Sequence, residues 1–237
     1  MHNLLRAIHS NPKKWAALAR DSDKLRAELQ KLIDQGLFYL RYTTGDPADN
    51  MRKKGVKVVA DYITHYVGEL AELEFEPEKE FETLIDYEDG EGGALISGAI
   101  DIVRQDNPPR VTLIDFKSGD PDSDNHQKLD EEEMRLQVAI YGVAAKRELE
   151  YLPERGLVRY LDEDDAEKRE LKVPLDDGAI RDARALVAVT AAKIRDRVFS
   201  AGPRQRPDRT ARCENCDFVG FCGMPPAKEH KRQALHR

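Results

Sequence analysis

The segments GAIDIV at residues 98–103 and LIDFKSG at residues 113–119 decide the fold of this chain. Both are short and apolar, and turn signals bound them: EDGEGG before the first and RQDNPP between the two. Together with EKEFETLIDY at residues 78–87, they predict three consecutive strands joined by turns. Each strand carries an acidic residue, which is costly to bury unless it is paired or holds a cation.

Helical patterns surround these strands. Apolar residues recur at helical spacing through the first seventy residues, with a break at Gly45 and Pro47. Further along we expect a helix over 130–150, strands over 155–161 and 168–174, and a helix over 177–199. This order predicts an α/β fold, a mixed central β-sheet flanked by helices with an amino-terminal helical region.

The chain divides into a core and a tail. We expect one domain over residues 1–200, with a helical region at 1–70 and the chemically active motifs at 71–145. Residues 201–237 form a cysteine-containing tail that we expect to pack back on this domain.

Composition excludes several classes of protein. The 237 residues include 38 basic and 45 acidic ones, for a net charge of −7. The tail after residue 200 holds eight basic and four acidic residues, so it carries +4 and the rest of the chain −11. No apolar run approaches the roughly 18 residues needed to span a bilayer, and no signal peptide opens the chain. We therefore expect neither a membrane protein nor a dedicated basic DNA-binding domain.

The acidic residues of the strands suggest a cation site. Asp115 and Lys117 are two residues apart in a strand, so their side chains lie on one face. Asp101 ends the apolar run before it, and Glu78 opens the preceding strand. Carboxylates bind Mg²⁺, and a lysine can orient an attacking water. Taken alone, an Asp-x-Lys pair is more often a solvated pair on an edge strand.

Three motifs in order carry a family resemblance. Gly-x-x-Asp at 98–101, Asp-x-Lys at 115–117 and Gln-x-x-x-Tyr at 137–141 together resemble the PD-(D/E)xK nuclease superfamily. The resemblance is closest to its RecB-like branch, which includes AddA, AddB and RecB-type helicase-nucleases and the CRISPR-adaptation exonucleases. It implies a restriction-endonuclease-like core, Mg²⁺ or Mn²⁺ as cofactor and DNA as substrate.

The resemblance also implies roles for individual residues. The metal ligands would be His2, Glu78, Asp101, Asp115 and the Phe116 backbone carbonyl. Lys117 would position the water, and Gln137 and Tyr141 would contact the DNA near the scissile bond or support the lysine. Glu80 is an alternative to Glu78, because both lie on one face of EKEFE. The plain alternatives are a polar helix face for Gln137 and a core position for Tyr141.

The amino terminus bears on this assignment. His2 falls where RecB-like nucleases carry a histidine that is an additional metal ligand, so we expect the chain to be a fragment of a longer protein. A terminal histidine can equally be a frayed end. His9 is expected on the surface.

All three cysteines lie close together near the other end. Cys213, Cys216 and Cys222 have the spacing of a metal or cluster site, and their odd number argues for a reducing compartment, which we expect to be cytoplasmic. The string CENCDFVGFCG resembles the carboxy-terminal part of the AddB iron–sulfur motif, which implies a 4Fe–4S cluster whose fourth cysteine is absent here. The alternative is a zinc site completed by His230.

These patterns predict a Mg²⁺- or Mn²⁺-dependent deoxyribonuclease that is the carboxy-terminal module of a superfamily-one helicase-nuclease in DNA repair and recombination. Its partners would be DNA and the covalently linked helicase domain. The alternatives are a stand-alone CRISPR-adaptation-type exonuclease, a catalytically silent DNA-binding scaffold of the same fold, and a small zinc-dependent interaction domain.

Overall fold

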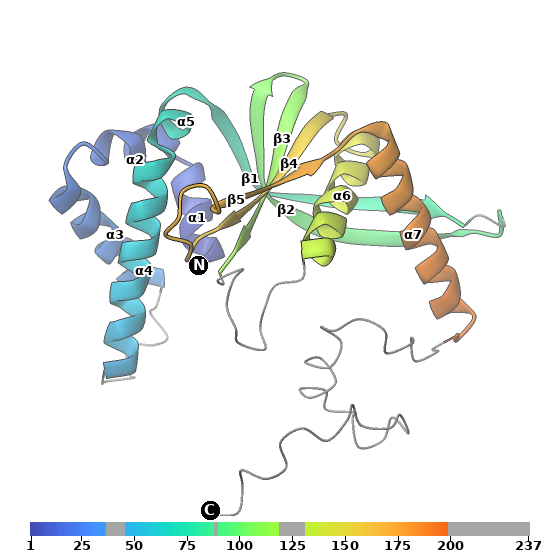
Figure 1. The fold of residues 1–237 in the computed structure, drawn as a ribbon, viewed down its shortest axis with the longest axis horizontal. Coiled ribbons are helices and arrows are strands. Elements are labelled where there is room, and N and C mark those ends of the chain that lie inside the picture. The colour runs from blue at the N-terminus through green and yellow to red at the C-terminus, as the bar shows by residue number, and fades with distance from the viewer. Residues whose placement is uncertain (37–45, 88–89, 119–130, 199–237) are drawn as a thin grey trace, which may run out of the picture.

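A computed structural model describes residues 1–36, 46–87, 90–118 and 131–198 (Figure 1). The tail over 201–237 and its three cysteines lie outside the described residues, so the predicted cluster and the packing of the tail stay predictions. Within the described part of the chain, no helix is long and apolar enough to cross a membrane.

One mixed sheet organises the fold, in the strand order β1-β2-β3-β4-β5. Its strands are β1 (Glu74–Asp86), β2 (Gly93–Asn107), β3 (Arg110–Lys117), β4 (Leu152–Tyr160) and β5 (Glu170–Pro174). Neighbouring strands are antiparallel except β3 and β4, which are parallel. A parallel pair needs a crossover, which α6 (Glu131–Arg147) supplies. The predicted mixed sheet and its three-strand meander are confirmed.

Helices cover both faces of the sheet (Figure 1). The amino-terminal helical region consists of α1 (His2–His9), α2 (Pro12–Leu18), α3 (Ser22–Gly36), α4 (Asp46–His65) and α5 (Val67–Glu72). We call the side of the sheet that these helices cover the back face. The front face lies beneath α6 and α7 (Asp177–Arg195). Pro47 falls in the first turn of α4, where its missing N–H costs no intrahelical hydrogen bond.

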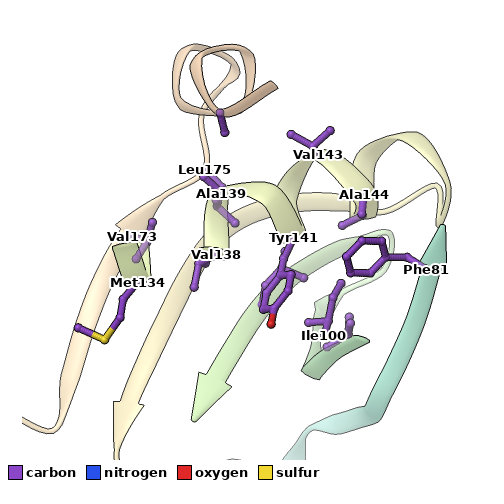
Figure 2. Packing of buried hydrophobic residues seen from close by; sticks show 14 of the residues in the cluster. Phe81, Ile100, Met134, Val138, Ala139, Tyr141, Val143, Ala144, Val173 and Leu175 are labelled. Atoms are coloured by element: carbon purple, nitrogen blue, oxygen red, sulfur yellow. The ribbon is translucent and has the colours of Figure 1, made fainter. Parts of the chain in front are cut away.

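Two hydrophobic cores result, one on each face. The front core joins α6 and α7 to strand residues such as Phe81, Ile100 and Val158. Figure 2 shows Tyr141 of α6 within it, its ring above the sheet beside Phe81 and Ile100. The back core joins α1–α5 to the opposite strand faces through Ile102, Ile114, Phe116 and Leu157.

A glycine brings α6 close to the sheet. A Cβ on Gly156 of β4 would clash with the Val138 side chain, so only glycine lets the two backbones approach this far. Val138 follows Gln137 directly, and Tyr141 lies one turn further on. The close approach therefore brings both predicted site residues of α6 down onto the sheet.

The strands β1 and β2 are irregular at one point. In β2, Ile100 and Val103 both belong to the front core, whereas Ile102 belongs to the back core. Strict alternation does not put residues three apart on one face, so the pleat is interrupted at Asp101. Pro77 pairs with Ile102 and Lys79 with Ile100, which places Glu78 opposite Asp101. Glu78 has a left-handed backbone with φ of 49°, an unusual conformation for a residue other than glycine.

Candidate active site

Three carboxylates lie at corresponding positions of three neighbouring strands. Glu78 of β1 lies opposite Asp101 of β2. The last recorded pair between β2 and β3 joins Ile102 to Ile114, and Asp101 is the residue of β2 next to that pair. The next position on β3 is Asp115. The Asp101 side chain replaces a ladder bond there, because its Oδ2 accepts the Phe116 N–H at 2.8 Å. The irregular point in the sheet is therefore where the predicted acids meet.

Each of these carboxylates lies close to a different nitrogen-bearing side chain. Lys117 Nζ lies 2.6 Å from Asp115 Oδ2, and His2 Nδ1 lies 3.3 Å from Asp101 Oδ1. Arg6 Nη1 donates to Glu78 Oε2 at 2.5 Å. The expected contact between Asp115 and Lys117 is present, and His2 does reach the sheet. Sequence reasoning missed Arg6, although it lies one helical turn after His2.

Asp115 is the most deeply buried of the three acids, with a side chain 2% exposed. Burial raises its pKa because it disfavours the charged form; Lys117 opposes this shift, and the nearby Asp101 adds to it. Oδ2 lies in ion-pair contact with the Lys117 ammonium and accepts no further hydrogen bond from the described residues. A buried carboxylate oxygen without a hydrogen bond is costly to keep, which is typical of functional sites.

A chain of hydrogen bonds connects α6 to this pair. Lys117 Nζ donates to Gln137 Oε1 at 2.9 Å, and Gln137 Nε2 donates to the Tyr141 hydroxyl at 2.7 Å. That hydroxyl makes a long contact of 3.5 Å to Asp115 Oδ1. Burial, with Asp115 nearby, raises the pKa of Tyr141, so the hydroxyl stays protonated and available as a donor. The geometry favours support of the lysine over an isolated polar helix face.

The donors present suit a hard divalent cation. Carboxylate oxygens are the ligands that Mg²⁺ and Mn²⁺ prefer, and Asp115 Oδ2 accepts no hydrogen bond beyond its contact with the Lys117 ammonium. As they stand in residues 1–36, 46–87, 90–118 and 131–198, however, no three histidine, cysteine or acidic side chains converge closely enough to form a metal centre. In this arrangement Asp115 lies against Lys117 and Glu78 against Arg6, so two of the acids face basic side chains.

The remaining candidates are placed less directly. Phe116 turns its ring into the back core, its N–H donates to Asp101, and its backbone pairs with Arg159 of β4. Glu80 is exposed on β1 and, unlike Glu78, lies beyond the point where the strands are irregular. Glu78 is thus the better placed of the two glutamates.

Glu78 lies within β1, which begins at Glu74, and does not open the strand as predicted. The prediction for His9 is also wrong. We expected it on the surface, but it is 1% exposed. Its ring packs between α1 and the back of the sheet, and burial lowers its pKa to about 4. His2, Arg6 and His9 have the spacing i, i+4, i+7, which puts them on one helix face, so the sequence did contain the signal.

The mixed sheet, its helical layers and the acidic residues on adjacent strands define an α/β protein with a restriction-endonuclease-like core. A family model described as "PD-(D/E)XK nuclease superfamily" matches residues 1–223, and the chain belongs to that superfamily. The solved structure titled "Crystal structure of SSO0001" is 16% identical, with a TM-score of 0.44, over 84% of this chain and 80% of that one. A search of curated proteins finds no match.

Proposed function

We propose that this protein is a metal-dependent deoxyribonuclease whose active site is formed by His2, Glu78, Asp101, Asp115 and Lys117. The observation that carries the proposal is the buried pair of Asp115 and Lys117 beside Asp101 on neighbouring strands of a PD-(D/E)XK chain. Burying a carboxylate is costly even when one lysine compensates its charge, and such costs are typical of functional sites.

The metal ligands in this proposal are the side chains of His2, Glu78, Asp101 and Asp115 and the carbonyl of Phe116. A bound Mg²⁺ or Mn²⁺ ion supplies Lewis acidity and lowers the pKa of water. Arg6 contacts Oε2 of Glu78 in the present arrangement, which leaves Oε1 as the oxygen that would reach a metal.

Lys117 has the role of orienting the attacking water and offsetting phosphate charge. Its ammonium is held between Asp115 and Gln137, at 2.6 Å and 2.9 Å respectively. Gln137 in turn is fixed by Tyr141. These two residues of α6 thus keep the lysine in one orientation, which is how a preorganised site lowers the barrier.

The wider context of the activity is also a proposal. The motifs and the cysteine spacing support a carboxy-terminal module of a superfamily-one helicase-nuclease of the RecB and AddB type, acting in the cytoplasm in DNA repair and recombination. In that context Cys213, Cys216 and Cys222 would supply three ligands of an iron–sulfur cluster, and the helicase would deliver the DNA strand.

Cleavage of labelled linear DNA tests the activity. Single- and double-stranded substrates are incubated with the chain in Mn²⁺, Mg²⁺ or EDTA, alongside Asp115→Ala. The matched control is Glu154→Gln, an exposed β4 residue paired with Arg110 outside the site. We expect metal-dependent cutting by the wild type and the control, and none by Asp115→Ala. Cutting that survives in Asp115→Ala would place the chemistry elsewhere, and a wild type inactive with both metals would contradict the proposal.

A further inference from the structure

The first helix carries a third polar residue on the face that holds His2 and Arg6. His9 follows His2 by seven residues, and α1 therefore touches the sheet through three polar side chains: His2 at Asp101, Arg6 at Glu78, and His9 on the back face. The first two are largely exposed, with side chains 61% and 49% accessible. His9 is the buried end of the row, and Leu5 and Ile8 of α1 are buried with it.

Hydrogen bonds connect this histidine to a buried network. Its Nδ1 lies 2.8 Å from the Leu5 carbonyl oxygen, which can only accept, so Nδ1 carries the proton. Burial keeps the ring neutral, and Nε2 therefore accepts from the Tyr62 hydroxyl at 3.0 Å. The same hydroxyl accepts from Arg159 Nη1 at 3.1 Å. Each group in this chain therefore donates to the next one: Arg159 donates to the Tyr62 hydroxyl, and that hydroxyl donates to His9 of α1.

Arg159 is itself fixed on the far side. It is 1% exposed and donates to both carboxylate oxygens of Glu69, at 3.0 and 2.8 Å, and to Glu170 at 2.9 Å. Its guanidinium also lies 3.7 Å from the centre of the Tyr66 ring. Tyr62 therefore donates its hydroxyl to His9 from a rigid support.

This network lies directly behind the candidate active site. Phe116, between Asp115 and Lys117, pairs with Arg159 in the parallel β3–β4 register. The His9 ring contacts the Phe116 ring, with centroids 5.7 Å apart, and meets Phe75 edge-on at 5.0 Å. One side chain thus contacts the strand that carries Asp115 and Lys117 and also anchors the helix that carries His2.

We infer that His9 is a positioning residue, which fixes α1 against the back of β3 and so holds His2 beside Asp101. The inference rests on the proposed function, because it concerns a ligand of the proposed metal. His9 touches neither substrate nor metal in this role. It acts through the orientation of α1, as residues behind a ligand commonly do.

Two variants separate positioning from simple packing. His9→Phe keeps a ring of similar size but removes both hydrogen bonds. His9→Gln restores an acceptor for Tyr62 near the place of Nε2, and it serves as the conservative rescue. If His9→Phe does not melt cooperatively, Tyr62→Phe removes the same bond from the other side.

Histidine-ring NMR of the full metal-free chain provides the first measurement, with the His2 signal assigned by its loss in His2→Gln. In His9→Phe we expect the chemical shift of the His2 ring to move to the value that it has in Asp101→Asn. In His9→Gln we expect it to return to the wild-type value. A His2 signal that stays at the wild-type position in folded His9→Phe would overturn the inference. This result needs no activity, so it decides the inference even if the wild type cuts no DNA.

Mn²⁺ affinity, measured by electron paramagnetic resonance of the free ion, provides the second. We expect about ten-fold weaker binding in His9→Phe. In a His2→Ala background the same change should have little further effect, because the ligand that His9 positions is already gone. Equal losses in both backgrounds would show a general packing role and would also overturn the inference. Absence of Mn²⁺ binding by the wild type would instead count against the proposed function.

Discussion

Two buried charged residues, Arg159 on the back face of the sheet and Asp115 on the front face, have different surroundings. Arg159 on the back face bonds to Glu69, Glu170 and Tyr62, with Tyr66 beneath its guanidinium. Asp115 on the front face has the Lys117 ammonium beside it, yet one of its oxygens accepts no hydrogen bond from the described residues. A buried charged group whose polar atoms all make hydrogen bonds stabilises the fold. A buried carboxylate with an oxygen that accepts no hydrogen bond is a candidate for chemistry.

The largest effect that separates the two faces is on activity. Asp115→Asn should lower the rate of metal-dependent cleavage about a thousand-fold, roughly 4 kcal/mol in the barrier. The free energy of unfolding should stay level or rise by about 1 kcal/mol, because the buried charge is removed. Cleavage assays and urea unfolding test both. Marked destabilisation would mean that Asp115 supports structure as Arg159 does.

Removing the back-face charge should do the reverse. Arg159→Met leaves Glu69 and Glu170 without their main partner and should destabilise the fold by about 3 kcal/mol. Both acids keep some contact with water, which places the cost toward the lower end of the range for buried pairs. The exposed Arg110→Met, which breaks the pair with Glu154, should cost less than about 1 kcal/mol in the same urea titration. Equal costs would remove the distinction between a buried and a surface pair.

Acid should act on the two faces with opposite sign. The pKa of His9 falls from 6.5 to about 4 on folding, so the unfolded chain takes up a proton first. Between pH 6.5 and 4, this group alone should remove up to roughly 3 kcal/mol of stability. Asp115 has a raised pKa, so its protonation in the folded state favours folding as the pH falls.

Unfolding free energies measured from pH 7 to pH 4 test the His9 contribution. His9→Phe should show a shallower fall than the wild type over this window. An identical slope in the two proteins would show that His9 does not account for the acid sensitivity. Asp115→Asn should fall more steeply than the wild type, since it lacks the opposing group.

The smallest effect concerns α6. Gln137→Ala should lower kcat about ten-fold, or 1.4 kcal/mol, with KM unchanged, because Gln137 holds the lysine in place. Tyr141→Phe should act in the same direction, since it removes the hydroxyl that fixes Gln137. Steady-state kinetics on single-stranded DNA separate the possibilities. A raised KM with unchanged kcat would indicate that Gln137 contacts DNA instead.

Much of the front face could be predicted from the chain alone. The three central strands, α6 and the closing helix were expected close to where they lie, because periodicity and turn residues are local signals. Asp115 and Lys117 were expected side by side for the same reason, since two residues of one strand share a face. The ordered motifs pointed to Asp101, Gln137 and Tyr141 as well.

The back face depends on contacts between segments far apart in the sequence. His9 meets Tyr62 across 53 residues, and Arg159 meets Glu69 across 90. The helical spacing of His9 from His2 and Arg6 did signal its burial. No sequence pattern, however, identifies the distant partners of His9 and Arg159, so those contacts could not be predicted. The pairing of Glu78 with Arg6 was hidden for the same reason.

The sequence by itself determined which strands and helices form and which residues are candidates for the active site, because those properties follow from local pattern and residue type. Only the tertiary structure decided which basic side chain lies beside each acid and which distant residues contact α1. Burial and hydrogen-bond direction set those partners, and both arise only when distant segments pack against one another.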